Sequence, residues 1–311
     1  MKNYFYYLLL LAAIVSCKNN STQSNPDTTD TTKLDITRPA DDRGPVQSIK
    51  LSPKWMSDSI LITSESLIYD DKTSNYYVSC INGVPPTKKD GDGFIAIIDS
   101  RGNIVNSKWL SGLNAPKGIV IKGNQIIVTD IDELVIINKS KGEIEKRLLI
   151  PGAKFLNDIA LAPDGSLYFT DSSTNTIYRY SDDKVTLYKR DKNFGGCNGI
   201  FVDHETIHVV GFDSGDISSI DIDSKKVTNH GKSIVPGGDG IAPWQGGFIM
   251  SNWNGEVYYI DALYKATKVL DTKDLEINAA DIVVNSKTNE ILIATFFDNR
   301  VVSYGIEDVF K

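Results

Sequence analysis

One short phrase recurs five times after residue 110 at almost constant spacing, and this repeat restricts the possible folds more than any other feature. The phrase reads PKGIVI, LNDIAL, CNGIFV, GDGIAP and AADIVV, and the residues just before its Gly or Asp are Lys117, Asn157, Asn198, Asp239 and Ala280. The steps between these positions are 40, 41, 41 and 41 residues, which is the length of a β-propeller blade. The sequence therefore predicts a protein built from repeated blades.

Each repeat unit contains the pattern of four short strands separated by turns. In the third unit an apolar run at 159–162 is followed by a Pro-Asp-Gly turn and by β-rich runs at 166–171, 176–180 and 184–189. Proline presets φ and glycine accepts a positive φ, so Pro-Asp-Gly favours a tight turn. No helical period of useful length occurs in the mature chain. These features predict an all-β fold.

A further unit precedes the five phrases and completes the ring. SESLIYD, which begins at Ser64, matches an innermost strand and places Glu65 at the repeating position. The last unit, 281–306, supplies only three strands, and the alternating segment 46–51 is the natural fourth. Such closure joins the two chain ends and removes an exposed sheet edge. The prediction is a six-bladed β-propeller closed by an N-terminal strand in the last blade.

The N-terminus has the features of an export signal. Residues 1–16 form a short apolar run, too short to span a bilayer, that ends in IVSC, a sequence that resembles a bacterial lipobox. We expect cleavage before Cys17 and lipidation of that residue, although an ordinary secretory signal with a coincidental cysteine is the alternative. Residues 17–45 then form a lipid-anchored disordered tether, and 46–311 the propeller domain. This organisation predicts a bacterial lipoprotein of the cell envelope, at the outer membrane facing the periplasm.

The net charge and the cysteines limit the classes of binding partner and the disulfide bonds that we expect. Residues 1–16 contain one charged residue, Lys2, so removing them changes the formal net charge from -7 to -8. This mildly acidic balance argues against a nucleic-acid partner. Cys80 and Cys197 fall in opposite blades, so we expect no disulfide between them. We expect a monomer that binds a small-molecule substrate or ligand.

The repeating position of the innermost strands collects polar side chains around the axis. In chain order it holds Glu65, Lys117, Asn157, Asn198, Asp239 and Ala280. Two carboxylates and two amides provide oxygen ligands of the kind that Ca²⁺ prefers, and the three histidines do not cluster as a zinc site would require. The alternative is that these side chains satisfy one another by hydrogen bonds in a wet channel.

With these residues in place, the chain resembles the senescence marker protein, gluconolactonase and luciferin-regenerating enzyme family of six-bladed propellers. ESLIYD, LNDIALAPDGSLYFTD, CNGIFVD and GDGIAP carry the resemblance, which covers residues 46–311. It implies a divalent ion held by Glu65, Asn157, Asn198 and Asp239.

The resemblance also implies hydrolysis of a lactone or related ester. The ion would polarise the carbonyl, and Asp239 would act as general base on a water molecule. Strand order places a second set of residues on the same rim, as candidate walls of a substrate pocket: Cys80, Asp130, Asp171, Asn175, Asp213, Trp253 and Phe297. For the Asp and Asn residues among them, ordinary turn formation is an equal alternative.

Two residues depart from the family pattern. The family has a substrate-binding arginine where this chain has Phe155, which argues against a sugar acid as substrate. The ring also contains Lys117, whose charge would repel a metal ion. Three arrangements are open for Lys117: its ammonium points away from the axis, it contacts a substrate anion or acts as a catalytic base, or it pairs with Glu65 or Asp239 and replaces the metal.

Two functions follow from these alternatives. The first is a metal-dependent hydrolase of lactone or ester type, with Asp239 and Lys117 as catalytic residues. The second is a non-catalytic propeller, anchored in the envelope, that binds a protein, a glycan or a small ligand. The fold alone does not distinguish them.

Overall fold

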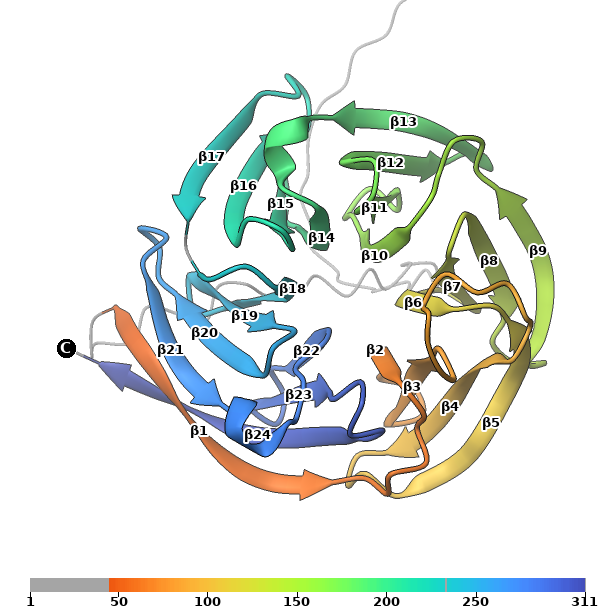
Figure 1. Ribbon diagram of the computed structural model, residues 1–311, viewed down its shortest axis with the longest axis horizontal. Helices are drawn as coiled ribbons and strands as arrows, with labels where there is room; N and C mark the ends of the chain where they lie inside the picture. Colours follow the sequence, from red (N-terminus) through yellow and green to blue (C-terminus); the bar gives the residue numbers. More distant parts are fainter. Residues whose placement is uncertain (1–44, 233, 311) are drawn as a thin grey trace, which may run out of the picture. The chain divides into compact units, whose positions relative to one another are not determined.

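The computed structural model describes residues 45–232 and 234–310. In this part of the chain, 24 strands form six four-stranded antiparallel sheets that radiate from a common axis (Figure 1). The prediction of an all-β, six-bladed propeller is confirmed. The calls on the signal peptide, on Cys17 and on the tether up to residue 44 lie outside the described residues. None of the described helical segments is long and apolar enough to cross a membrane.

The strands follow the chain blade by blade, with the innermost strand first in each. Blade one contains β2 (Ser64–Asp70), β3 (Asn75–Cys80), β4 (Gly93–Asp99) and β5 (Ile104–Leu113). Blade two contains β6 (Pro116–Lys122), β7 (Gln125–Asp130), β8 (Glu133–Asn138) and β9 (Glu143–Leu149). Blade three contains β10 (Leu156–Leu161), β11 (Leu167–Asp171), β12 (Thr176–Ser181) and β13 (Lys184–Arg190).

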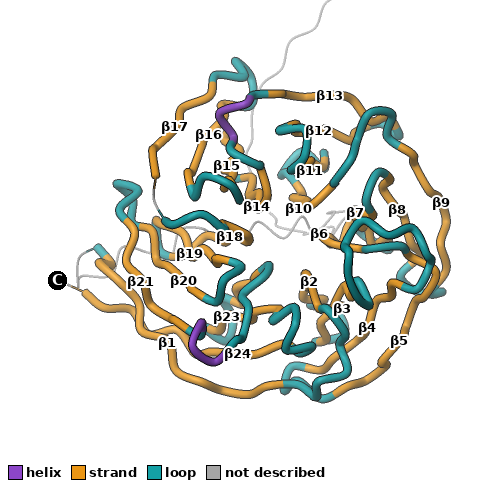
Figure 2. Tube along the Cα trace, viewed as in Figure 1, coloured by secondary structure: helices purple, strands orange, loops and turns teal. Residues whose placement is uncertain are grey.

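The second half of the ring continues in the same order. Blade four contains β14 (Cys197–Val202), β15 (Thr206–Gly211), β16 (Asp216–Asp221) and β17 (Val227–Lys232). Blade five contains β18 (Gly238–Trp244), β19 (Gly247–Asn252), β20 (Glu256–Ile260) and β21 (Ala266–Asp271). Blade six contains β22 (Ile282–Asn285), β23 (Glu290–Ala294), β24 (Val301–Phe310) and β1 (Val46–Met56). Figure 2 shows the two short 3-10 turns of this part of the chain, η1 (Lys192–Phe194) and η2 (Lys273–Leu275), each between neighbouring blades.

Strand β1 closes the ring as the outermost strand of blade six, as predicted. It pairs antiparallel with β24 from Val46 opposite Phe310 to Met56 opposite Val302. The strand is longer than the alternating segment 46–51 suggested, because pairing continues past Pro53 through a register shift. A strand from the start of the domain therefore covers what would otherwise be an open edge of the last blade.

The hydrophobic core is divided among the six junctions between neighbouring blades. Each of six buried apolar clusters draws its side chains from two adjacent sheets. Cys80 lies in the cluster between blades six and one, Cys197 in the one between blades three and four, and both are free thiols. Because the apolar side chains fill these junctions, the polar groups collect at the axis and the rims.

Candidate functional site at the axis

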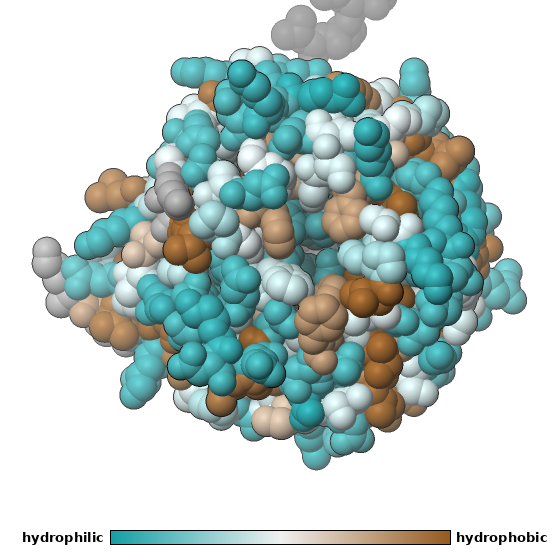
Figure 3. Space-filling model, viewed as in Figure 1, coloured by the Kyte–Doolittle hydropathy of each residue, from teal (hydrophilic) through white to brown (hydrophobic). Residues whose placement is uncertain are grey.

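The ring positions lie in bulges of the innermost strands. Pairing with the second strand shifts register in five blades, between Ser64 and Ser66 in β2 and across the equivalent positions of the others, which are Pro116/Ile119, Leu156/Ile159, Cys197/Ile200 and Gly238/Ile241. A bulge interrupts the regular alternation of side chains and re-aims the extra residue. The bulges therefore take the repeating residues out of the sheet pattern. Figure 3 shows a hollow at the centre of the face that it draws.

The ring side chains are buried. Glu65 is 6% exposed, Asn157 6%, Asn198 2% and Asp239 4%, and Lys117 and Ala280 are fully buried. Glu65 and Asp239 come from blades one and five, yet they are close enough for their charges to interact, and the Asn198 side chain lies beside Asp239. The structure thus brings together three of the four predicted ligands, and Asn157 lies on the inner strand next to that of Asn198.

Two further carboxylates lie one residue beyond the ring, and the sequence analysis did not assign them. They are Asp158, which is buried, and Asp281, which is half-buried. One oxygen of Asp158 accepts a hydrogen bond from the amide of Ile200 in the next blade, at 2.8 Å. Asp281 accepts one from the hydroxyl of Ser66. The signal was present, because LNDIAL and AADIVV have Asp where the other three phrases have Gly.

Burial and mutual repulsion raise the pKa of the buried carboxyl groups at the axis, so these groups stay protonated to a higher pH than usual. Burial raises the pKa of Glu65 to about 7, with Lys117 lowering and Asp281 raising it. Burial raises the pKa of Asp281 to about 6. The pKa of Asp239 is raised well above its ordinary value by burial and by its carboxylate neighbours, and that of Asp158 by burial and by Asp281. A cation among these groups would favour their charged forms.

Two buried oxygens of the ring have no hydrogen-bond partner. They are Glu65 Oε2 and Asn198 Oδ1. Buried polar atoms are nearly always paired, so a buried oxygen without a partner is a candidate ligand for an ion or a water molecule. The Asn157 amide donates to Ser172 Oγ at 3.3 Å, and its oxygen accepts no side-chain or backbone donor from the described residues. Glu65, Asn157, Asn198 and Asp239 therefore fit a hard, oxygen-binding cation.

Binding of a cation at the ring would depend on the side-chain amides of Asn157 and Asn198. Among the residues that the structure describes, no group of three or more His, Cys, Asp or Glu is placed to hold a metal ion. The ring contributes only two carboxylates, Glu65 and Asp239, so a cation there would need the oxygens of Asn157 and Asn198 as well.

Lys117 hydrogen-bonds to main-chain oxygens, one of them in a rim loop, and to none of the ring carboxylates. Its Nζ donates to Ala115 O at 2.9 Å and to Pro86 O at 3.1 Å, and it lies 4.5 Å from the centre of the Phe155 ring. Burial lowers its pKa to about 8, although Glu65 and Asp130 oppose this shift at longer range. Neither Glu65 nor Asp239 forms an ion pair with it, so the arrangement in which Lys117 replaces the metal by direct pairing is not the one observed.

Three predicted wall residues are engaged with backbone amides. Asp130 accepts from Ala115 N at 2.7 Å, and Asp171 from Lys154 N at 2.8 Å. The Asn175 oxygen accepts from Gly196 N at 2.7 Å. These side chains hold the turns that lead into the next inner strand. Contact of any of them with a substrate stays a prediction and would require it to leave these amides.

The other predicted wall residues differ in exposure. Trp253 and Phe297 lie together, with ring centres 5.8 Å apart, and Phe297 is 50% exposed. Asp213 is exposed at the turn after β15. Cys80 is fully buried in the core, and burial raises the pKa of its thiol. Cys80 therefore does not line an open pocket, whereas an aromatic pair does stand on the rim.

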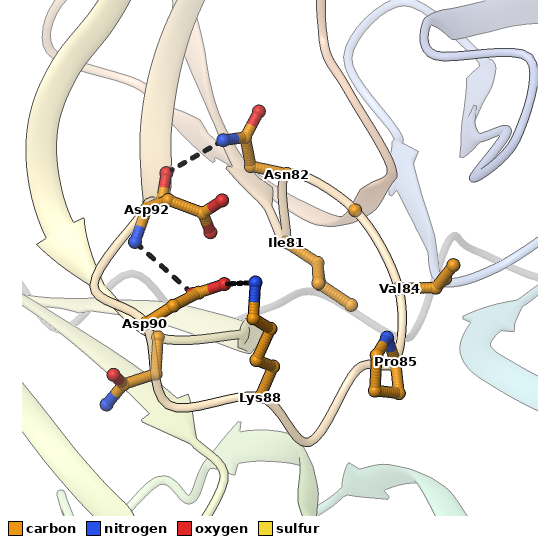
Figure 4. A pocket seen from close by; sticks show the side chains of 9 residues that line it. Ile81, Asn82, Val84, Pro85, Lys88, Asp90 and Asp92 are labelled. Atoms are coloured by element: carbon orange, nitrogen blue, oxygen red, sulfur yellow. Dashed lines mark hydrogen bonds and ion pairs between the residues drawn. The ribbon is translucent and has the colours of Figure 1, made fainter.

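A small cavity lies at the loop of residues 81–92, which joins β3 to β4. Its volume is about 50 Å³, and Figure 4 shows the Lys88–Asp90 ion pair, 2.8 Å long, at its edge. Asn82 donates to Asp92 O at 3.2 Å in the same loop. None of the ring residues lines this cavity. The loop reaches the ring instead through Pro86 O and Lys117.

Comparisons with known proteins support the fold. No protein-family model matches the chain, and no curated protein matches it. Among solved structures, it is similar to a gluconolactonase from Xanthomonas campestris, with 15% identity, a TM-score of 0.63 and coverage of 87% of this chain and 99% of the other. A streptogramin B lyase has 13% identity, a TM-score of 0.61 and coverage of 84% and 98%. A catalytically inactive virginiamycin B lyase from Staphylococcus aureus, solved with quinupristin, has 16% identity, a TM-score of 0.58 and coverage of 83% and 99%. At this identity the likeness shows the propeller fold alone.

Proposed function

We propose that this chain is a metal-dependent hydrolase of lactones or related esters and that its metal is Ca²⁺, held by Glu65, Asn157, Asn198 and Asp239. One observation carries the proposal: two ring oxygens, Glu65 Oε2 and Asn198 Oδ1, are buried without a partner. Burial raises the pKa of Glu65 and of Asp239, and a cation bound between them would favour their charged forms. The likeness of the fold to a gluconolactonase supports the reaction class.

The ring residues have distinct roles in this proposal. A bound divalent cation would supply Lewis acidity, polarising the substrate carbonyl. Asp239 would take a proton from the attacking water, with the Asn198 side chain beside it. Lys117 has three N–H donors and uses two on Ala115 O and Pro86 O, so one is left to donate to a negatively charged substrate oxygen. Trp253 and Phe297 would contact the substrate at the rim, and so would Asp130, Asp171, Asn175 and Asp213 where their turns allow it.

A second candidate is a non-catalytic propeller that binds a protein, a glycan or a small ligand. The observation that favours it is the lack, among the described residues, of three acidic, His or Cys side chains placed around one metal position. In this case the ring carboxylates would stay protonated, and the buried amides would hold water.

We further propose that the protein is a monomer anchored by lipid at Cys17 in a bacterial outer membrane, facing the periplasm. The support for the lipid anchor is the sequence of residues 1–17. Labelling with a radioactive fatty acid would test it, because Cys17→Ser should abolish the label.

Turnover with and without metal distinguishes the two functions. The purified protein is assayed on a panel of lactones and aryl esters with excess Ca²⁺ or with EDTA. The hydrolase proposal expects Ca²⁺-dependent turnover that falls by a factor of about 10² to 10⁴ in Asp239→Asn, the range for loss of a general base. Equal rates with EDTA, or no turnover by protein shown to contain metal, would refute it. Absence of both metal and turnover would favour the binding propeller.

A further inference from the structure

A hydroxyl on the second strand of four blades hydrogen-bonds to the ring residue of the following blade. Ser79 donates to Lys117 O at 2.6 Å and Ser251 to Ala280 O at 2.5 Å. Thr170 donates to Asn198 O at 2.7 Å, and Thr129 donates to Asn157 O. All four donor residues are fully buried. The same contact therefore joins neighbouring blades at the level of the candidate site.

The bulges explain why a hydroxyl is needed there. Because the inner strand leaves register at the ring, the amide that follows the ring residue loses its regular partner in the ladder. The hydroxyl accepts from that amide in its own blade: Ser79 from Ser66 N at 3.1 Å, Thr170 from Asp158 N at 3.1 Å and Ser251 from Gly240 N at 2.7 Å. One hydroxyl thus connects the bulge of one blade to the ring carbonyl of the next.

Two blades lack the contact, and their identity is informative. Blade four has Val210 at this position, so no side-chain hydroxyl reaches the carbonyl of Asp239 among the described residues. Blade six has Ala294 at this position, because Ile282 pairs with Ile293 as Ile159 pairs with Phe169 in blade three. The next residue, Thr295, donates within its own blade, to Arg300 O at 2.8 Å. Both amide residues of the ring, Asn157 and Asn198, are therefore fixed by a threonine of the preceding blade, whereas Asp239 is not.

We propose that Thr129 and Thr170 are positioning residues that fix the amide ligands Asn157 and Asn198 for cation binding. The inference rests on the proposed metal site. A neutral amide attracts a cation less than a carboxylate does, so its contribution depends on an oxygen already held in place. Fixing the main chain of Asn157 and Asn198 at the carbonyl limits where their side-chain oxygens can lie. The proposal assigns this task to residues that touch neither metal nor substrate.

The test measures Ca²⁺ affinity by calorimetry in three variants. Thr170→Val removes the hydroxyl at nearly constant volume, and we expect affinity to fall about 10-fold to 100-fold. Thr170→Ser retains the hydroxyl, so its Ca²⁺ affinity should stay within about threefold of the native value, whereas valine at this position should lower the affinity. Thr295→Val is the matched control, because it removes an equally buried hydroxyl whose bond stays inside one blade; its Ca²⁺ affinity should be unchanged.

Native affinity in Thr170→Val, or an equal loss in Thr295→Val, would overturn the proposal. Thr129→Val, which unpins Asn157, gives an independent reading if Thr170→Val does not fold. If the native protein itself binds no Ca²⁺, the proposed function fails, and crystal structures decide the positioning role separately. A shift of about 1 Å in Asn198 Oδ1 of Thr170→Val would support it, since about that looseness disables a built site. An unmoved oxygen would refute it.

Discussion

The close approach of the inner strands around the axis makes Gly199→Ala a demanding test of the site. A Cβ at Gly199 would lie 2.0 Å from Asp239 O and 2.9 Å from Val210 Cγ1. The overlap is with a main-chain oxygen in a bulged strand, so relief requires that strand β18 move. Overpacking costs about 1–3 kcal/mol, and occasionally more. We expect the upper end, about 3 kcal/mol, because a backbone atom cannot rotate away as a side chain can.

Because the displaced residue is Asp239, stability and metal binding should fall together. A loss of about 3 kcal/mol corresponds to a decrease in Tm of roughly 6–12 °C for a domain near this size. Ca²⁺ affinity should fall about 10-fold or more, since a ligand carboxylate has moved. Differential scanning calorimetry and titration calorimetry measure the two effects.

Gly231→Ala in the same blade is the control. Its new Cβ would meet no heavy atom within 4 Å, although its φ of +85° makes alanine strained there. It should lower Tm but leave Ca²⁺ affinity unchanged. Gly199→Ala with native stability, or with lost stability and native metal affinity, would refute the reasoning.

Three other predictions follow from the same geometry. Asp171→Ala should destabilise the protein by about 1–3 kcal/mol in urea unfolding, because it leaves the main-chain amides of Lys154 and Thr174 without their acceptor. A change below about 0.5 kcal/mol would contradict the role as a turn cap. The Tm of the metal-free protein should fall as pH rises from 5 to 8, because the pKa of Glu65 is raised to about 7 and that of Asp281 to about 6. The folded state then holds protons that the unfolded state has released, so raising the pH favours unfolding. Ca²⁺ should remove most of this pH dependence, and a Tm that rises with pH in EDTA would contradict the prediction. Lys117→Met should tighten Ca²⁺ binding at least about tenfold. Charges of +1 and +2 repel by about 3 kcal/mol at about 10 Å with an effective dielectric constant of about 20. Unchanged affinity would contradict this prediction and show that the ammonium is too distant or too well screened to matter.

Most of the fold could be predicted from the period of the repeat. Equal spacing of one phrase fixes the number of units, and a three-stranded last unit calls for a strand from the other end of the chain, which is β1. Its length was underestimated, because the alternation stops at Pro53 while pairing continues. The ring residues could be identified for the same reason, since equivalent positions in a propeller face one axis.

The rest of the site depends on contacts between blades, which a single repeat does not reveal. Thr170 reaches Asn198 only because the strands bulge, and no local pattern marks that bulge. The direction of the Lys117 ammonium depends on Pro86, in a loop 31 residues earlier. The sequence does not show the role of Asp158 within the repeated phrase, because that role depends on the bond from Ile200 N in the next blade.

The content of the ring itself is the most direct test of the account. Bound Ca²⁺ is measured by atomic emission in the native protein, in Glu65→Gln and in Glu256→Gln, which alters a carboxylate that is equally buried but paired with Lys268 and Lys273. We predict stoichiometric Ca²⁺ in the native protein and in Glu256→Gln, and its loss in Glu65→Gln. Native protein without a stoichiometric divalent ion, or Glu65→Gln that retains one, would contradict the account.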